Sequence, residues 1–384
     1  MIEIPDIQKS GRTVKLGKLV IKLGSAVIAG KDRRPDEAAL ASIADSVAAL
    51  RKAGVEVILV SSGAIGMGRQ TFPKFKARTI PDRQALAAVG QVGLMHAWNH
   101  LFSERGLRVA QILLTRGDME DRRRYLNTRY TLERLTALGA IPIINENDTV
   151  TVDELKFGDN DELSAVVATK IGADMLVILS VAPGLLEKDG GKKGGLTSRV
   201  IPLVEQVDGG VLGNVSKEKS AIGLGGMGSK LTAVRMATQA GVSVVIAGGK
   251  TPGILEQILT GAFIGTYFTP VCEHHISGRG RWLAFGRKPH GRIIVDDGAR
   301  DALVIRKKSL LPAGIKKVEG DFENGDLVEV CDPEGNAFAR GLVSYDAATL
   351  ARIKGKKTVQ IREILGELEY EEAIHRDNLV VVAG

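Results

Sequence analysis

Cysteine, aromatic residues and long apolar runs are all scarce in this chain of 384 residues. The two cysteines, Cys272 and Cys331, stand in no metal-binding or redox spacing, which excludes a disulfide scaffold and indicates reduced thiols in a cytoplasmic protein. No run reaches the ~18 apolar residues of a transmembrane helix, so no membrane partner is expected. The amino-terminal residues include Glu3, Asp6 and Lys9 without an apolar segment, unlike a secretory signal.

Glycine and positive charge are abundant instead, with 46 glycines and a net charge of +7. A basic chain invites a nucleic-acid partner. Residues 276–384 hold 18 basic and 17 acidic residues, a net of +1, whereas the remaining +6 lies in residues 1–275, where 34 basic residues face 28 acidic ones. A segment that binds an RNA backbone should carry the surplus itself. RNA binding by the C-terminal segment stays an alternative that rests on two local basic patches, residues 306–308 and 354–357.

Short apolar runs alternate with helical periodicity from residue 18 to about residue 269. The runs are rich in Val, Ile and Leu, which is typical of a mostly parallel sheet sandwiched by helices, an α/β fold. In such sheets ligands bind beyond the carboxyl ends of the strands. The expected strands are residues 19–23, 55–60, 108–115, 140–145, 174–180 and 242–247, and the expected helices are 36–53, 122–138, 159–171 and 228–240.

The pattern changes after residue 270. Residues 271–288 are irregular and charged, and the following runs are short and separated by turn signals. Residues 327–331 and 337–345 predict a hairpin around a turn with Pro333 and Gly335, and 292–295 and 380–382 predict further strands. We therefore expect an N-terminal extension (1–17), an α/β domain (18–270), a connector (271–288) and a small β-rich domain with one or two short helices (289–384).

Three motif-like stretches lack the context that their chemistry requires. Residues 223–228 match G-x-G-x-x-G, but no strand precedes them and no acidic residue follows at the right distance. Residues 375–377 read His-Arg-Asp, as in a protein-kinase catalytic loop, but no Asp-Phe-Gly follows. His96 and His100 have zinc-like spacing without a third ligand, so no protein metal site is expected.

Two small-residue loops are candidate anion sites. Lys22 lies inside a predicted buried strand, where its ammonium group needs an anion, and Gly24 lets the backbone approach that anion. The alternative is that Lys22 extends its side chain to water. Ser62 to Gly66 opens a predicted helix whose N–H groups favour a carboxylate or phosphate, although a tight turn would explain these residues equally well.

Two further loops complete the constellation. Residues 145–148 and 158–161 are dense in carboxylates and amides, which suits an α-amino group or a metal, or merely a helix cap at 159 or 160. Residues 223–230 place small residues before Lys230, which suits a nucleotide polyphosphate, or form a solvated glycine loop. Two lysines, glycine loops and one acidic centre together indicate a phosphoryl-transfer site.

These motifs, in this order, resemble the glutamate 5-kinase family, enzymes of the amino-acid-kinase fold. The resemblance rests on residues 20–25, 61–65, 113–116, 118–121, 145–148, 158–161 and 225–227 with Lys230, and runs from about Lys18 to the end. The C-terminal segment is similar to a PUA domain, a small pseudo-barrel. The alternative is a kinase of the same fold that acts on another acid or phosphate acceptor.

The resemblance implies that the γ-carboxylate of L-glutamate takes the γ-phosphoryl of ATP, with Mg²⁺ bridging the phosphates, as the first step of proline biosynthesis. It also implies feedback inhibition by proline and a homo-oligomer, a dimer or a tetramer. A carboxylate is already ionised at pH 7, so no general base is needed.

The resemblance also assigns residue roles. Lys22 and Lys230 would neutralise the transferring phosphoryl group, and Asp161 would orient both lysines. Two positions on the nucleotide side, Val181 and Leu224, depart from residues common in the family. Glutamate would contact Ser62, Asp148 and Asn160, with Asn145 nearby, and ATP would contact Lys22, Gly24, Ser25, Ser180, Val181, Leu224, Gly225, Gly226, Met227, Gly228, Ser229 and Lys230.

Overall fold

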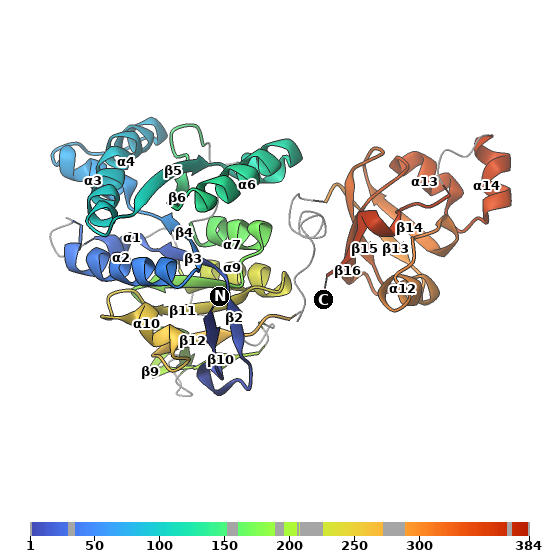
Figure 1. The fold of residues 1–384 in the computed structure, drawn as a ribbon. Coiled ribbons are helices and arrows are strands. Elements are labelled where there is room, and N and C mark those ends of the chain that lie inside the picture. Colours follow the sequence, from blue (N-terminus) through green and yellow to red (C-terminus); the bar gives the residue numbers. More distant parts are fainter. Residues whose placement is uncertain are drawn as a thin grey trace. The chain divides into compact units, whose positions relative to one another are not determined.

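Two separate sheets organise the chain, which divides near residue 275 into two compact units (Figure 1). The computed structural model describes residues 2–29, 35–151, 160–188, 196–205, 207, 226–271, 289–366 and 371–382. The predicted connector, apart from residue 271, lies outside these ranges.

The first unit is built on an eight-stranded sheet in the order β10-β12-β11-β7-β3-β4-β6-β5. The six strands from β11 to β5 are parallel to one another, whereas β12 runs antiparallel to its neighbour β11 and β10 runs parallel to β12. The predicted mostly parallel fold is confirmed, and all six expected strands are present. Their bounds are β3 (Lys18–Leu23), β4 (Glu56–Ser61), β5 (Arg108–Leu114), β6 (Ala140–Glu146), β7 (Met175–Ser180) and β11 (Ser243–Gly248), with β10 (Leu203–Val204) and β12 (Gly265–Phe268) completing the sheet.

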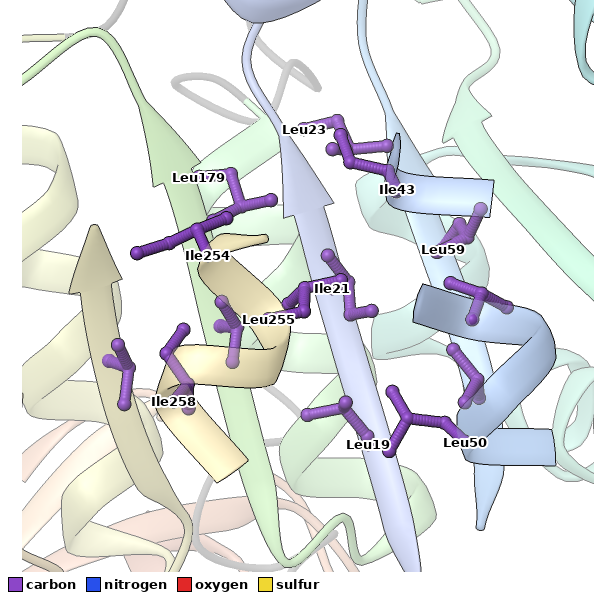
Figure 2. Close-up of a cluster of buried hydrophobic side chains, with 14 of the residues drawn as sticks. Leu19, Ile21, Leu23, Ile43, Leu50, Leu59, Leu179, Ile254, Leu255 and Ile258 are labelled. Carbon is purple, nitrogen blue, oxygen red and sulfur yellow. The ribbon is translucent and has the colours of Figure 1, made fainter. Parts of the chain in front are cut away.

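Alternation along β3 separates the core of the unit from its chemistry. Leu19, Ile21 and Leu23 point to the face covered by α2 (Glu37–Lys52) and α10 (Ile254–Leu259), as Figure 2 shows. Because successive strand residues point to opposite faces, Lys22 lies on the other face. That face carries α7 (Asn160–Ile171) and α9 (Met227–Gln239).

The helix α4 (Ile80–Ser103) is the largest element that the periodicity did not predict. It begins with a capping box between Thr79 and Asp82, and it crosses α3 (Ala64–Thr71) very closely. A Cβ atom built on Gly90 would lie 1.8 Å from the carbonyl oxygen of Ala64, so only glycine permits this crossing. The remaining helices are α1 (Ser25–Ile28), α5 (Arg116–Glu120) and α6 (Arg122–Ala137).

Residues 2–16, predicted to be an extension, pack into the core of the first unit. The strands β1 (Ile2–Ile4) and β2 (Val14–Leu16) pair antiparallel around the short 3₁₀ helix η1 (Ile7–Lys9). Ile4, Ile7 and Leu16 are fully buried with the residues that cover β3. A second small hairpin pairs β8 (Leu186–Lys188) with β9 (Leu196–Val200).

The second unit has a five-stranded sheet in the order β14-β13-β15-β16-β17 and its own apolar core. The predicted hairpin is confirmed as β15 (Leu327–Cys331) and β16 (Ala337–Leu342). Three short helices, rather than one or two, occur in its described part. The other elements are β13 (Gly291–Val295), β14 (Ile315–Gly320), β17 (Leu379–Val381), α12 (Asp297–Val304), α13 (Ala347–Ile353), α14 (Thr358–Leu365), η3 (Pro312–Gly314) and η4 (Arg376–Asn378).

Within the described ranges of both units, none of the helices is long and apolar enough to span a bilayer.

Candidate active site

The candidate residues lie beyond one edge of the eight-stranded sheet. Because the central strands are parallel, β3, β4, β6, β7 and β11 all end at the same edge, and loops that are distant in sequence meet there. The strands end at Leu23, Ser61, Glu146, Ser180 and Gly248.

A buried carboxylate between two lysines is the centre of this edge. Lys22 Nζ forms an ion pair with Asp161 Oδ1 at 2.5 Å, and Lys230 Nζ donates a hydrogen bond to Asp161 Oδ2 at 3.0 Å. Asp161 is fully buried, and both lysines are nearly so. Two positive charges against one negative charge leave an unbalanced cation in a dry environment, which is costly unless an anion binds beside it.

The ionisation of Asp161 follows from its neighbours. Burial alone would raise the pKa of the carboxyl group, but the charges and hydrogen bonds of Lys22 and Lys230 outweigh burial and hold the pKa below its ordinary value. Asp161 is therefore an anion at neutral pH. It holds both ammonium groups with its two oxygens, which leaves it unsuited to accept a proton from a substrate.

A chain of amide groups lies beside this centre. Asn160, which precedes Asp161 at the start of α7, donates through Nδ2 to Ser62 Oγ at 2.7 Å and to Asn145 Oδ1 at 3.0 Å. Asn145 in turn donates through Nδ2 to Gln91 Oε1 at 2.8 Å. The structure thus brings together three of the residues predicted to contact the acid substrate, from β6, α7 and the loop after β4. Asp148 follows β6 and is partly buried, with interactions of its own.

The helix α4 supports these loops through residues that the sequence analysis missed. Gln84, Gln91 and Trp98 are spaced seven residues apart and share one face of the helix. Gln84 Nε2 donates to the Thr151 carbonyl oxygen at 3.2 Å, and Trp98 Nε1 donates to Ser61 Oγ at 3.0 Å. The seven-residue spacing of polar and indole groups was the available signal for these contacts.

On the nucleotide side the structure describes most, but not all, of the predicted residues. Gly24 precedes α1, and its amide donates to the Leu179 carbonyl oxygen at 3.1 Å. A Cβ atom at Gly24 would lie 3.8 Å from Lys22 Nζ, so a longer side chain would crowd the ammonium group. Ser25 begins α1, Ser180 ends β7, and the side chain of Val181 is largely exposed.

The loop before α9 is described only from Gly226 onward. Gly226 precedes the helix, Ser229 Oγ donates to its carbonyl oxygen at 2.9 Å, and an added Cβ at Gly228 would meet no atom of the described residues within 4 Å. Among the described residues, nothing blocks this stretch of backbone next to Lys230. Leu224 and Gly225, like residues 158 and 159, lie outside the described residues.

The acidic motif at residues 118–121 has a local structural explanation. Asp118 accepts hydrogen bonds from the Thr115 amide at 2.8 Å and the Thr115 hydroxyl at 2.6 Å, and so caps the start of α5. Burial raises the pKa of Asp118, but these bonds and Arg124 outweigh it and keep the pKa low. Asp118 thus has a structural role at the start of α5.

The side chains at this edge of the sheet fit a divalent cation only when a phosphate ligand brings the ion with it. In the part of the chain that the structure describes, no three His, Cys, Asp or Glu side chains gather as a metal site. Asp161 has both oxygens engaged by lysines. Mg²⁺ keeps several of its waters and commonly binds substrate phosphates, so these residues would meet such an ion only together with a phosphate ligand.

Comparison with known proteins agrees with this geometry. The sequence pattern of the amino acid kinase family matches residues 17–248, and that of the PUA domain matches residues 291–365. The fold and the buried lysine bridge thus define a member of the amino acid kinase family with an added PUA domain.

A finer subdivision follows from whole-chain relatives. Proteins named glutamate 5-kinase from Pelobacter propionicus, Geobacter sulfurreducens and Dictyoglomus turgidum are 43%, 44% and 45% identical to this chain. These alignments cover 96%, 97% and 95% of this chain and 98%, 100% and 97% of the relatives. Within the amino acid kinase family, the chain belongs to the glutamate 5-kinases.

Proposed function

We propose that this enzyme transfers the γ-phosphoryl group of ATP to the side-chain carboxylate of L-glutamate, giving ADP and L-glutamyl 5-phosphate. The observation that carries the proposal is the buried bridge of Lys22, Asp161 and Lys230, whose surplus positive charge lies where parallel strands end. Full-length similarity to glutamate 5-kinases supports glutamate as the acceptor.

The reaction needs charge neutralisation more than proton transfer. A carboxylate oxygen of glutamate attacks the γ-phosphorus, a new O–P bond forms, and the bond to the β-phosphate bridging oxygen breaks with its electron pair leaving on ADP. The acceptor is already ionised at pH 7, so no side chain has to remove a proton. Lys22 and Lys230 stabilise the charge on the transferring group, and Asp161 keeps both ammonium groups in place.

The two substrates occupy different loops in this proposal. Ser62, Asn145, Asp148 and Asn160 hold glutamate, because their amides, hydroxyl and carboxylate suit a zwitterion. MgATP lies along Gly24, Ser25, Ser180, Val181 and residues 224–230. Its phosphates carry the magnesium ion, and the protein supplies lysines and backbone N–H groups.

Two properties implied by the resemblance are part of the proposal. Proline shares the α-carboxylate and α-ammonium-type nitrogen of glutamate, so it would compete for the amide groups of Asn145 and Asn160. Added proline should then raise the apparent KM for glutamate without lowering kcat.

A homo-oligomer is the other property. The largely exposed Val92 on α4 is an apolar residue that such an assembly could cover. Light scattering of the purified protein measures the size of the assembly.

We further propose that the enzyme acts in the cytoplasm, in proline biosynthesis, and that its domain bounds are those stated from the sequence, except that residues 2–16 belong to the first domain, whose core they join. The C-terminal unit carries exposed basic residues at 306–308, but its charges nearly balance. This balance favours small anionic substrates in the first unit over an RNA backbone on the second.

Trapping the acyl phosphate tests the proposed reaction. Purified protein with ATP, Mg²⁺, L-glutamate and hydroxylamine should form γ-glutamyl hydroxamate, because hydroxylamine attacks acyl phosphates. Omission of ATP or glutamate is the control. If another carboxylic acid gives a hydroxamate and glutamate gives none, the substrate assignment is wrong.

A further inference from the structure

Apart from Asp161 Oδ1, which pairs with Lys22, two buried polar atoms lack hydrogen-bond partners within the part of the site that the structure describes: Gln91 Nε2 and Asn160 Oδ1. One is a donor and the other an acceptor. Gln91 is only 8% exposed, so water does not readily satisfy its amide group. A buried polar group without a partner is costly, and a bound ligand with complementary groups would remove that cost.

These atoms are the two ends of one hydrogen-bonded chain. Asn145 lies between them, donating to Gln91 Oε1 at 2.8 Å and accepting from Asn160 Nδ2 at 3.0 Å. Both ends therefore belong to residues that touch the same carboxamide, beside Ser62 and next to Asp161 in sequence.

The backbone fixes which atoms donate and which accept along this series of hydrogen bonds. The Glu146 amide can only donate, and it donates to Asn145 Oδ1 at 2.9 Å. The other terminal atom of Asn145 must then be its NH₂ group, which requires the oxygen of Gln91 opposite it and leaves the Gln91 NH₂ group unpaired. For the same reason Asn160 turns its NH₂ group toward Asn145 and keeps its oxygen unpaired.

We propose that Gln91 is a recognition residue for the amino-acid substrate: its Nε2 donates to the α-carboxylate, while Asn160 Oδ1 accepts from the α-ammonium group. This inference rests on the proposed function. An α-amino acid carries an acceptor, the carboxylate, and a donor, the ammonium group, on one carbon atom. These two groups complement the free donor of Gln91 and the free acceptor of Asn160 at the ends of the hydrogen-bonded chain. The remaining carboxylate of the substrate is then free to face the lysines.

The helix α4 holds Gln91 rigidly enough for this role. Two turns before and after it, Gln84 and Trp98 bind Thr151 and Ser61, so the helix is fixed to the loops on either side of the hydrogen-bonded chain. A preorganised donor gains more from a charged acceptor than a mobile one does, because little side-chain entropy is lost on binding.

The substitution Gln91→Glu tests the donor end of the hydrogen-bonded chain separately from the acceptor end. A glutamate side chain still accepts from Asn145, but when ionised it has no donor and repels a carboxylate. Two substrate analogues provide the readout as competitive inhibitors against glutamate. Glutarate keeps the carboxylate and lacks the ammonium group, whereas 4-aminobutyrate keeps an ammonium group and lacks the α-carboxylate.

In Gln91→Glu we expect the KM for glutamate and the inhibition constant of glutarate to rise at least about tenfold, as for loss of a hydrogen bond to a charged group. The inhibition constant of 4-aminobutyrate and the KM for ATP should change less than twofold. Lowering the pH should partly restore glutarate binding, because the introduced carboxyl group regains a donor once it is protonated. The matched control is Gln84→Glu on the same face of α4, which should leave the ratio of the two inhibition constants unchanged.

The results distinguish this inference from the function on which it rests. Equal weakening of both analogues, or no weakening of either, in an enzyme that still makes γ-glutamyl hydroxamate would overturn the role of Gln91 alone. A wild-type enzyme that makes no γ-glutamyl hydroxamate would overturn the proposed function, and the inference with it. If Gln91→Glu does not fold, the uncharged Gln91→Met gives the same comparison, with glutarate weakened more than 4-aminobutyrate.

Discussion

Each unit of this protein holds one carboxylate between two cationic side chains, but in very different surroundings. In the first unit Asp161 binds Lys22 and Lys230 with no exposure of its own side chain. In the second unit Glu329 on β15 binds Arg292 at 3.2 Å and Arg340 at 3.0 Å, and these side chains are 19%, 50% and 26% exposed.

The contrast shows what burial adds to the same charge pattern. Arg292, Glu329 and Arg340 are directly opposite one another on neighbouring strands, so sheet register alone brings them together, and water screens their charges. Asp161 joins a strand and two helices from distant parts of the chain. Little water screens the charges around Asp161, so they act strongly on a nearby anion, which makes this the arrangement that suits a transferring phosphoryl group.

The largest expected effect is that of Asp161→Asn. The substitution leaves two buried lysines without their counter-ion, which should destabilise the folded state by about 3–5 kcal/mol, the usual cost of breaking a buried pair. Phosphoryl transfer should fall by at least the ~10²-fold expected for loss of one electrostatic group. Urea unfolding and the hydroxamate assay measure the two effects. A fully active, equally stable variant would remove the distinction between the two units.

Acid titration sharpens the same comparison. The pKa of Asp161 is lowered in the folded state, despite burial, by its two lysines. Its contribution to stability is therefore complete above the unfolded-state pKa of about 4 and is lost as the pH falls through the folded-state pKa. The stability difference between the wild type and Asp161→Asn should be constant from neutral pH down to about pH 5, and should narrow below about pH 4. Narrowing already at neutral pH would contradict the assigned ionisation.

Removing one cation should affect catalysis in the first unit alone. Lys230→Ala should lower kcat by about 10²-fold or more, because a preorganised charge no longer faces the transferring group. Arg340→Ala removes a cation from the exposed bridge and should leave kcat unchanged. Steady-state kinetics of both variants with glutamate and ATP makes the comparison, and an unchanged kcat in Lys230→Ala would exclude its proposed role.

The sequence predicted those parts of the fold that have a strong local pattern. Apolar runs located all six parallel strands, and Leu40, Ile43, Val47 and Leu50 located α2, whose ends agree with the expected helix. The helix α4 was missed because Val89 and Val92 are exposed among small residues, so no polar face marks its outer side.

The site was predictable only where its residues stand out one by one. Lys22 stands out because a lysine in an apolar run is costly. Its ion pair with Asp161 depends on how distant elements are arranged in the fold, and the role of Asp161 was predicted only from the resemblance to the family. Gln91 gave no such signal, because a glutamine in an alanine-rich helix becomes informative only when Asn145 is seen beside it.

Helical glycines give a smaller test of close packing in the two units. Gly90→Ala places a methyl group where the Ala64 carbonyl oxygen lies, so α3 and α4 must move apart, and we expect a loss of about 1–3 kcal/mol. Gly298 in α12 has only ordinary contacts around an added Cβ, and Gly298→Ala should stabilise the second unit by about 0.5 kcal/mol. Thermal unfolding of both variants measures the difference, and the same sign for both would contradict the packing argument.

The smallest expected effect is that of Glu329→Gln. The side chain at position 329 loses its negative charge but keeps an oxygen that Arg340 can bind, and each arginine remains in contact with water. Surface ion pairs contribute about 0–1 kcal/mol, so stability should fall by less than about 1 kcal/mol, with kcat and KM unchanged. Even this small loss should shrink in high salt, which screens exposed charges, whereas the loss in Asp161→Asn should persist because its lysines are buried. A loss in Glu329→Gln that matched Asp161→Asn, and that salt did not reduce, would mean that the strand register rather than water exposure determines what such a bridge contributes.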